Sequence, residues 1–395
     1  MLALLLTACG GAAPVPPTRG ALPTLPGVGW RLLAEPISAE NANRLALIGN
    51  LVGHTATVNH FAFDSLRNWL ISVDAVGVAI LWDLNNGRRI QVLSQPDPAL
   101  GAEGDVLNAF FSAEGETIAL VTRRGVRFLR AADRSPLPDM AGGVIAVSGA
   151  AISADGRQLA TTGSNGDLWL WETTSGRVAQ RSAGRGYLAE RPLFAPDGAQ
   201  LAVIARDERG ALVRLYNARN GQVLAELRGF SGAPVALAFN PDSTLLAVGS
   251  AGEVQAFRTS DYAQVYRITA PELDPRRGLA FSPDKRLLII GGAGDEVFVQ
   301  AAADGLGVRR LTEHGGRLSG LAFSADGALL LTALSDSRGV YVWLVESIRI
   351  ESPNYLRGAL GQGQSGFLMG AFSPDGKLIA LAEASGGVMI YGIPR

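Results

Sequence analysis

Short apolar runs alternate along most of the chain with clusters of glycine, aspartate, asparagine, proline and serine. Runs such as Leu245–Val248 and Leu287–Ile290 are apolar at every position, and turn-forming residues flank them. Runs of this kind are typical of buried β-strands, because a helix would need a longer segment with a period of 3.6 residues. No window of about 20 apolar residues occurs, so no transmembrane helix is predicted. The pattern predicts an all-β fold built from many short strands.

One unit recurs eight times along the chain: an apolar strand ends at a large apolar residue, and a turn of the Ser-Pro-Asp-Gly type follows. In that turn Pro fixes φ and Gly accepts a positive φ. Each unit then has a second buried strand, a third strand such as Val340–Trp343, and a more polar fourth strand. Four strands in a repeat of about 44 residues are typical of a propeller blade. The eight anchors are Phe63, Phe111, Ile152, Phe194, Phe239, Phe281, Phe323 and Phe372.

The first repeat carries Gly53-His54 before its first strand and Trp82-Asp83 at the end of its third strand. With the eightfold repeat, these residues make the range 41–395 resemble the WD-repeat β-propeller family. The resemblance implies a structural hydrogen-bond tetrad, made by a loop His, a strand Ser or Thr, a turn Asp and a Trp. In repeat 1, His54, Ser72 and Trp82 match, but Val76 stands at the turn-Asp position, so this tetrad is expected to be broken.

The seventh repeat comes close to the same tetrad, with one extra residue in its turn, through His314, Thr332, Asp336 and Trp343. The other repeats lack the His. Blade rigidity is therefore expected to come mainly from apolar packing between strands.

Eight repeats of this size account for the range 41–395, which predicts one ring of eight four-stranded antiparallel blades, with seven blades as the alternative. The last repeat ends after its third strand, Val388–Tyr391. The segment Arg44–Leu51 has the pattern of a fourth strand and precedes the first Gly-His. We expect it to pair with the last blade and close the ring, because closure removes an exposed sheet edge.

The N-terminus has the apolar run Leu2–Leu6, followed by Thr7-Ala8-Cys9-Gly10, and Cys9 is the only cysteine of the chain. This stretch resembles the bacterial lipobox, which implies lipidation of Cys9 and removal of residues 1–8 as a signal peptide. The run is short and has no preceding Lys or Arg, so either the true start lies upstream or the match to the lipobox is accidental. The Pro-rich residues within 9–40 are interpreted as a tether. This predicts an extracytoplasmic protein held on the bacterial membrane through its lipid anchor.

Composition argues against several other classes of protein. Lys and Arg number 35 and Asp and Glu 36, so no nucleic-acid partner is expected. One cysteine and three histidines make a metal centre improbable, and no cofactor or metal is predicted. Ser282 and Ser365 lie in motifs that resemble nucleophile motifs only formally, and we interpret both as turn or loop residues. His60 is interpreted as a packed or rim histidine, so no catalytic residue is assigned.

The resemblance further implies that residues beside the start of each first strand face the top rim, where partners of such propellers usually dock. The predicted top-rim residues are Asn59, Asp105, Glu190, Arg277, Arg317 and Ser319. Acid on blades 2 and 4 and arginine on blades 6 and 7, including Arg276, would suit a charged protein partner. The alternative is that these residues are only solvated loop charges. The sequence thus predicts a monomeric, non-catalytic interaction scaffold. A glycan or small-molecule module at the channel mouth is the alternative, and a propeller enzyme is the third reading.

Overall fold

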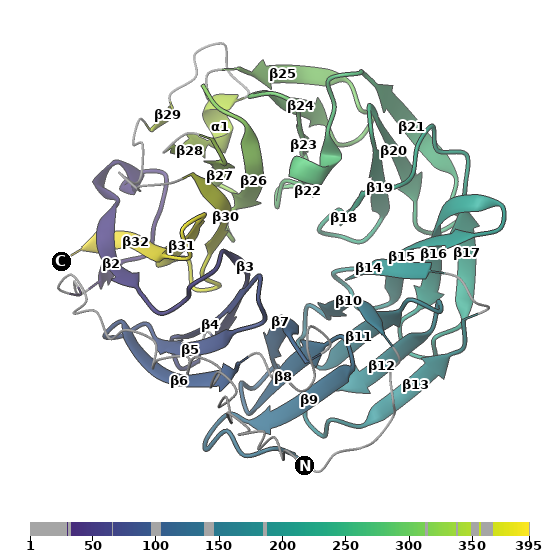
Figure 1. Ribbon diagram of the computed structural model, residues 1–395. Helices are drawn as coiled ribbons and strands as arrows, with labels where there is room; N and C mark the ends of the chain where they lie inside the picture. The colour runs from purple at the N-terminus through teal and green to yellow at the C-terminus, as the bar shows by residue number, and fades with distance from the viewer. Residues whose placement is uncertain are drawn as a thin grey trace, which may run out of the picture.

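The computed structural model describes residues 30, 33–64, 66–95, 104–137, 146–184, 188–312, 315–336, 339–348, 355–356 and 366–394. Eight antiparallel sheets stand around a ring, as the sequence predicts (Figure 1). In seven of the sheets the strands follow one another in chain order, from the innermost strand to the outermost; in the eighth, the outermost strands come from the start of the described chain. The protein is therefore an eight-bladed β-propeller, and the seven-bladed alternative was wrong.

The first four blades occupy residues 58–227. Blade 1 consists of β3 (Val58–Asp64), β4 (Trp69–Asp74), β5 (Ala79–Asp83) and β6 (Arg88–Ser94). Blade 2 consists of β7 (Val106–Phe111), β8 (Thr117–Thr122) and β9 (Gly125–Arg130). Blade 3 consists of β10 (Val147–Ile152), β11 (Gln158–Gly163), β12 (Leu168–Glu172) and β13 (Val178–Ser182). Blade 4 consists of β14 (Leu188–Phe194), β15 (Gln200–Asp207), β16 (Gly210–Asn217) and β17 (Val223–Leu227).

The remaining blades complete the ring. Blade 5 consists of β18 (Ala236–Phe239), β19 (Leu245–Ser250), β20 (Glu253–Arg258) and β21 (Gln264–Thr269). Blade 6 consists of β22 (Leu279–Phe281), β23 (Leu287–Gly291), β24 (Val297–Ala301) and β25 (Gly307–Leu311). Blade 7 consists of β26 (Leu318–Phe323), β27 (Leu329–Leu334), β28 (Val340–Leu344) and β29 (Tyr355–Leu356), with the short helix α1 (Val345–Ile348). Blade 8 begins with β30 (Phe367–Phe372), β31 (Leu378–Glu383) and β32 (Val388–Pro394).

The repeated Ser-x-Asp turn joins the first and second strands through side-chain hydrogen bonds. In blade 3, Ser153 Oγ donates to Asp155 Oδ1 at 2.6 Å and accepts the backbone N–H of Gln158 at 2.9 Å. Blades 6, 7 and 8 repeat this pair of bonds at Ser282, Ser324 and Ser373. The turn serine and aspartate satisfy each other and the backbone, which explains why this motif recurs.

Apolar packing holds adjacent blades together. The buried residues of the described chain form eight hydrophobic clusters, and each cluster joins two neighbouring blades. Most residues of the second strands are buried on both faces, as in β8, where every residue is buried. A strand buried on both faces reads as a continuous apolar run, which is the pattern in the sequence. Among the described residues, no helix is long and apolar enough to span a bilayer.

The ring closes through segments from the two ends of the described chain. β2 (Ala46–Leu51) pairs antiparallel with β32, with Leu51 opposite Val388, so the predicted closure is confirmed (Figure 1). Arg44, predicted in this strand, lies instead in the 3-10 helix η1 (Ala42–Arg44). β1 (Leu33–Glu35) also pairs with β32, although these residues belong to the range interpreted as tether. Cys9 lies outside the described residues.

Candidate functional site

The top rim is defined here as the edge of the ring at which the innermost strands begin. Because each blade is antiparallel, the hairpins between second and third strands also lie at this rim, and the outermost strands end there. The opposite edge, the bottom rim, holds the Ser-x-Asp turns and the hairpins between third and fourth strands. All predicted docking residues belong to the top rim, so its geometry decides what they can contact.

Blade 1 has a complete hydrogen-bond tetrad beneath this rim. His54 Nδ1 lies 2.9 Å from Asp74 Oδ2, and His54 Nε2 lies 2.6 Å from Ser72 Oγ. Trp82 Nε1 donates to the same Ser72 Oγ at 2.7 Å. The expectation of a broken tetrad at Val76 was wrong, because Asp74, two residues earlier, supplies the carboxylate. Asp74 Oδ1 also accepts the backbone N–H of Val78 at 2.9 Å, so one buried carboxylate binds both the turn and the loop.

The predicted tetrad of blade 7 is described only in part. Trp343 Nε1 donates to Thr332 Oγ1 at 3.0 Å, and Asp336 accepts the backbone N–H of Arg317 at 2.5 Å. His314 lies outside the described residues. Blade 3 has the same Trp-to-Thr bond, from Trp171 Nε1 to Thr161 Oγ1 at 3.0 Å, although its repeat lacks the His.

Four consecutive blades share a second polar contact, here called the clasp, which the sequence analysis did not predict. In blades 3 to 6, a carboxylate on the hairpin between second and third strands forms an ion pair with an arginine on or just after the outermost strand. The four pairs are Asp167–Arg181, Asp207–Arg228, Glu253–Arg267 and Glu296–Arg310. In three of them the arginine follows the acid by 14 residues. This recurring spacing is the signal that identifies the clasp, so apolar packing is not the only source of blade rigidity.

Glu253 is the most buried acid of these clasps, with a side chain that is 1% exposed. It accepts the backbone N–H of Ser231 at 2.8 Å and the side-chain amide of Gln255 at 2.8 Å, besides pairing with Arg267. Burial opposes ionisation, but the hydrogen bonds from Ser231 and Gln255 and the charge of Arg267 keep the pKa of Glu253 below its usual value. The carboxylate therefore binds the hairpin, the preceding loop and the outer strand together.

We expect Glu253→Ala to lower the free energy of unfolding by about 1–3 kcal/mol, because buried donors lose their acceptor. Glu296→Ala is the matched control, since Glu296 makes the equivalent clasp with Arg310 but is 21% exposed. The free energy of unfolding of Glu296→Ala is expected to fall by less than about 1 kcal/mol, in the range of exposed ion pairs. Urea unfolding followed by circular dichroism measures both values. Equal losses for the two variants would contradict the role given to burial.

The top-rim candidates Asn59 and Ser319 occupy equivalent positions at bulges. In β3, Val58 pairs with Asp74 and His60 with Val73, which leaves Asn59 as the extra residue. In β26, Ser319 is the extra residue between Leu318 and Gly320. A bulge re-aims the side chain of the extra residue. Asn59 is exposed, whereas Ser319 is half-buried and its Oγ donates to the Phe367 carbonyl of blade 8 at 2.6 Å.

The arginines of blades 6 and 7 differ in what they offer to a partner. Arg277, at the end of the 3-10 helix η3 (Pro275–Arg277), is 19% exposed, and its Nη1 donates to the Leu318 carbonyl at 2.6 Å. Arg276 is 60% exposed, and its Nε lies 2.8 Å from Asp274 Oδ1. Burial opposes ionisation of Asp274, but the hydrogen bond of Arg276 and the charges of both arginines lower its pKa. Arg277 thus joins blades 6 and 7, whereas Arg276 is held with its side chain in solvent.

The predicted acidic half of the rim is recessed. Asp105, which precedes β7, is half-buried, and its Oδ1 is buried without a hydrogen-bond partner. Glu190 is half-buried within β14, opposite Ile204. Arg317, by contrast, is exposed at the start of blade 7. Among the predicted top-rim residues, the structure therefore leaves Arg317 more exposed than either acid.

The remaining polar candidates have structural partners. His60 Nε2 lies 2.7 Å from the Ala109 carbonyl of blade 2, which assigns the proton to Nε2, and burial lowers the pKa of the imidazole. Ser282 Oγ serves its turn, as described above. Ser365 lies outside the described residues. Within the described part of the chain, no group of three His, Cys, Asp or Glu residues is placed to hold a metal ion.

The comparisons with known proteins agree with this fold. The WD domain, G-beta repeat family model matches residues 221–255 and 306–343. Each matched stretch begins at the outermost strand of one blade and ends within the third strand of the next, so the sequence repeat is offset from the blade. The same offset places β2, which precedes the first repeat, in the last blade.

Solved structures with a similar fold include three for which the alignment covers more than eight-tenths of both chains. The crystal structure of the C-terminal WD40 domain of Sif2 has a TM-score of 0.69 at 15% identity, covering 89% of this chain and 99% of that one. The Dos1 propeller has a TM-score of 0.70 at 14% identity, covering 92% and 95%. The computationally designed Ika8 protein has a TM-score of 0.68 at 19% identity, covering 87% and 98%. The chain is thus a propeller that carries two matches to the WD40 repeat and shares its fold with WD40 propellers.

Proposed function

We propose that this protein is a non-catalytic interaction scaffold of the bacterial cell envelope and binds a protein partner through its top rim. WD40 propellers, with which the chain shares its fold, typically serve as platforms for protein partners. The docking surface proposed here lies at the junction of blades 6 and 7, around Arg276 and Arg317. A partner with a complementary acidic surface fits this junction.

The top-rim part of the proposal rests on one observation: the recessed carboxylate of Asp274 binds Arg276, whose side chain is exposed. Asp274 has a side chain that is 9% exposed, and it holds Arg276, whose side chain is 60% exposed. Arg277, bound to the same carboxylate, ties this position to Leu318 at the start of blade 7. The cation is therefore fixed by the scaffold before a partner arrives, which lowers the ordering cost of binding. Arg317 stands one residue before Leu318 and adds a second exposed cation at the same junction.

The envelope part of the proposal rests on the sequence around Cys9. A diacylglyceryl group on that thiol, with an added acyl chain, would hold the protein at a membrane, since one chain alone binds only marginally. The Pro-rich residues that follow Cys9 would act as a spacer between the bilayer and the ring. Expression of the full chain in a bacterial host with an alkyne-labelled fatty acid tests this part. We expect the wild type to incorporate the label and to fractionate with membranes, and Cys9→Ser to do neither. Incorporation of the label by Cys9→Ser would refute lipidation at this residue.

Chemical cross-linking in envelope preparations tests the docking surface. The full chain is compared with Arg276→Glu/Arg317→Glu and with Arg219→Glu/Arg286→Glu, in which the same number of exposed arginines is reversed at the bottom rim. We expect one cross-linked protein to be captured by the wild type and the bottom-rim control, and lost from the top-rim variant. Equal capture by all three forms would overturn the assignment of the top rim. Arg277 is left unchanged, because its reversal would also break the contact with Leu318.

A further inference from the structure

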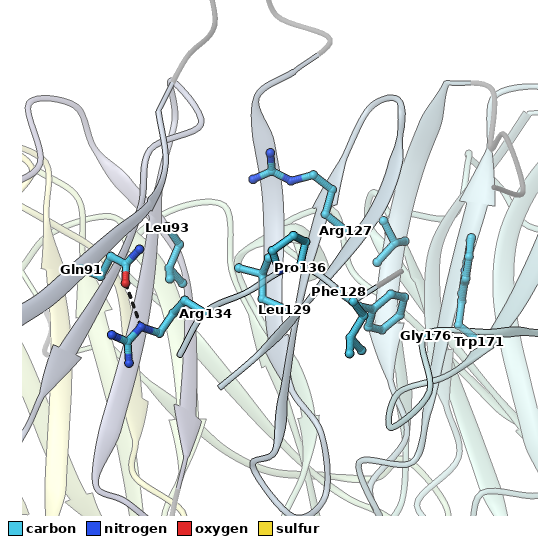
Figure 2. A pocket seen from close by; sticks show the side chains of 11 residues that line it. Gln91, Leu93, Arg127, Phe128, Leu129, Arg134, Pro136, Trp171 and Gly176 are labelled. Carbon is cyan, nitrogen blue, oxygen red and sulfur yellow. Dashed lines mark hydrogen bonds between the residues drawn. The ribbon is translucent and has the colours of Figure 1, made fainter. Parts of the chain in front are cut away.

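Two cavities lined by described residues of outermost strands differ in the chemistry of their walls. One, of about 330 Å³, lies beside blade 2, where Figure 2 shows Phe128 directed toward Trp171, with Leu93 on the other side of Leu129. The other, of about 450 Å³, lies between blades 3 and 4 and has a charged wall. Its volume falls within the range of ligand pockets, about 300–1,000 Å³. The second cavity therefore has both the room and the polar groups to orient a ligand.

Both neighbouring blades contribute to the wall of this second cavity. Ser182, the last residue of β13, and Ala183 line it from blade 3. Tyr216 of β16 and Val223 of β17, which pair across the two strands, line it from blade 4. The rest of the wall consists of three arginines and three acids: Arg209, Arg214, Arg228, Asp207, Glu208 and Glu226. These charges cancel, so the net charge of the wall favours neither an anion nor a cation.

Four of the charged side chains form one connected set of ion pairs. Arg214 Nε and Nη2 both donate to Glu226 Oε1, at 3.0 and 2.7 Å. Arg228 donates to Glu226 Oε2 at 3.0 Å and, through Nη1, to Asp207 Oδ1 at 3.1 Å. Arg214 is only 12% exposed, so its guanidinium is held in the wall and not in bulk solvent. Donors and acceptors are thus fixed before a ligand enters, which lowers the ordering cost of binding.

Blade 4 reverses the arrangement that its neighbours have at the same pair of strands. In blades 3, 5 and 6, an arginine of the outermost strand stands opposite a neutral residue of the third strand, in the pairs Arg181–Trp169, Arg267–Gln255 and Arg310–Phe298. Blade 4 instead has Arg214 on the third strand and Glu226 opposite it. In blade 3 the arginine covers its neighbour, because the Arg181 guanidinium lies 4.6 Å from the centre of the Trp169 ring. Glutamate is shorter than arginine, so this face of blade 4 is left uncovered where the cavity lies.

The hairpin at the top of blade 4 extends beside the cavity. β15 and β16 have eight residues each, whereas the second strands of the other blades have five or six. Asp207 pairs with Gly210, which leaves Glu208 and Arg209 as the two turn residues. Both are exposed, and both line the cavity. The longer hairpin therefore adds one acceptor and one donor at the opening of the cavity.

We propose that the cavity between blades 3 and 4 binds one ring of an uncharged glycan. A hydroxyl group both donates and accepts hydrogen bonds, and a guanidinium has five N–H donors, of which Glu226 takes two from Arg214. Adjacent sugar hydroxyls can therefore accept from Arg214 and donate to Glu226 while the ion pair stays intact. The site lies outside the docking surface of blades 6 and 7 and does not depend on the function proposed for the top rim.

Charged ligands fit this wall less well than a sugar does. A phosphate or carboxylate group would compete with Glu226 for Arg214 and Arg228, which already pair with it. A metal ion would need several ligand groups directed at one point, and the described residues contain no such group. Val223, which is 51% exposed, offers an apolar contact to the C–H groups of a sugar ring. An uncharged ring with many hydroxyls thus uses both the polar and the apolar parts of the wall.

Isothermal titration calorimetry of the full chain with cellotetraose, maltotetraose, mannotetraose and chitotetraose tests the proposal. We expect at least one of them to bind the wild type, with a Kd at least about tenfold weaker for Arg214→Gln. Arg310→Gln is the matched control, because Arg310 belongs to the same strand pair of blade 6 and pairs with Glu296. Its Kd should stay within about twofold of the wild type. Absence of binding by all four sugars, or equal losses for the two variants, would overturn the proposal.

Two further measurements separate sugar recognition from a folding defect and from charge attraction. Glu208→Ala/Arg209→Ala changes only exposed turn residues, so its thermal unfolding temperature should match the wild type while its Kd weakens at least about threefold. Unchanged binding by this variant would overturn the placement of the sugar beside the hairpin. Tetragalacturonate, an anionic sugar of similar size, should bind more weakly than the best uncharged sugar. Tighter binding of tetragalacturonate would overturn the assignment of an uncharged ligand.

Discussion

Replacing Trp82 by alanine is expected to lower the free energy of unfolding by about 3–5 kcal/mol. Trp82 is 2% exposed and belongs to the hydrophobic cluster that joins blade 8 to blade 1. Its removal leaves a cavity at the junction where the ring closes, and it deprives Ser72 Oγ of the indole donor. Both losses follow from the removal of one side chain, so the cost of the cavity and the cost of the lost buried hydrogen bond add.

Urea unfolding followed by far-ultraviolet circular dichroism measures this loss. Trp82→Phe keeps most of the apolar contact and loses the bond to Ser72, so it should cost about 1–3 kcal/mol. Leu66→Ala, at a position that is 69% exposed, is the surface control and should stay within about 0.5 kcal/mol of the wild type. A loss below about 1 kcal/mol for Trp82→Ala would show that the tetrad and its cluster contribute little to stability.

Replacing Leu51 by aspartate is expected to prevent stable closure of the ring. Leu51 is fully buried, pairs with Val388 of β32, and packs in the cluster between blades 8 and 1. An unpaired carboxylate at this position costs several kcal/mol, comparable with the whole stability of many domains. The closing strand should therefore detach, and blade 8 would keep an open edge at β32.

Limited proteolysis and circular dichroism measure the opening of the ring. Val52→Asp is the matched control, because Val52 is the next residue and is 38% exposed. We expect rapid cleavage and loss of β-structure for Leu51→Asp and wild-type behaviour for Val52→Asp. If Leu51→Asp resists protease as the wild type does, closure through β2 is not required for the fold.

The position of the tetrad acid shows why a motif can be misread from sequence alone. The family pattern places the acid by counting along the hairpin, which leads to Val76. Asp74 ends β4 and pairs with Val58 at the loop that carries His54, and its Oδ1 accepts the N–H groups of Val76 and Val78. The acid therefore stands at the start of the turn and not within it, and the sequence does not show which of these positions reaches the His.

Arg277 illustrates the same limit for surface residues. Its position before a first strand indicates the top rim, and it does lie there in η3. The sequence does not show that its guanidinium reaches the Leu318 carbonyl of the next blade, 41 residues away in the chain. Arg276, its neighbour, is the more exposed of the two, because the direction of each side chain from a 3-10 turn depends on how that turn packs against blade 7.

The sequence by itself determined the eight repeats, the turns between their first two strands and the closing segment, because each of these can be recognised from a local pattern of residues. Periodic apolar runs dictate buried strands, and Ser-x-Asp turns satisfy themselves within six residues of chain. Only the tertiary structure decided which acid completes the tetrad and which arginines remain in solvent. Those features depend on contacts between blades, where distant residues compete for the same hydrogen bonds and the same space.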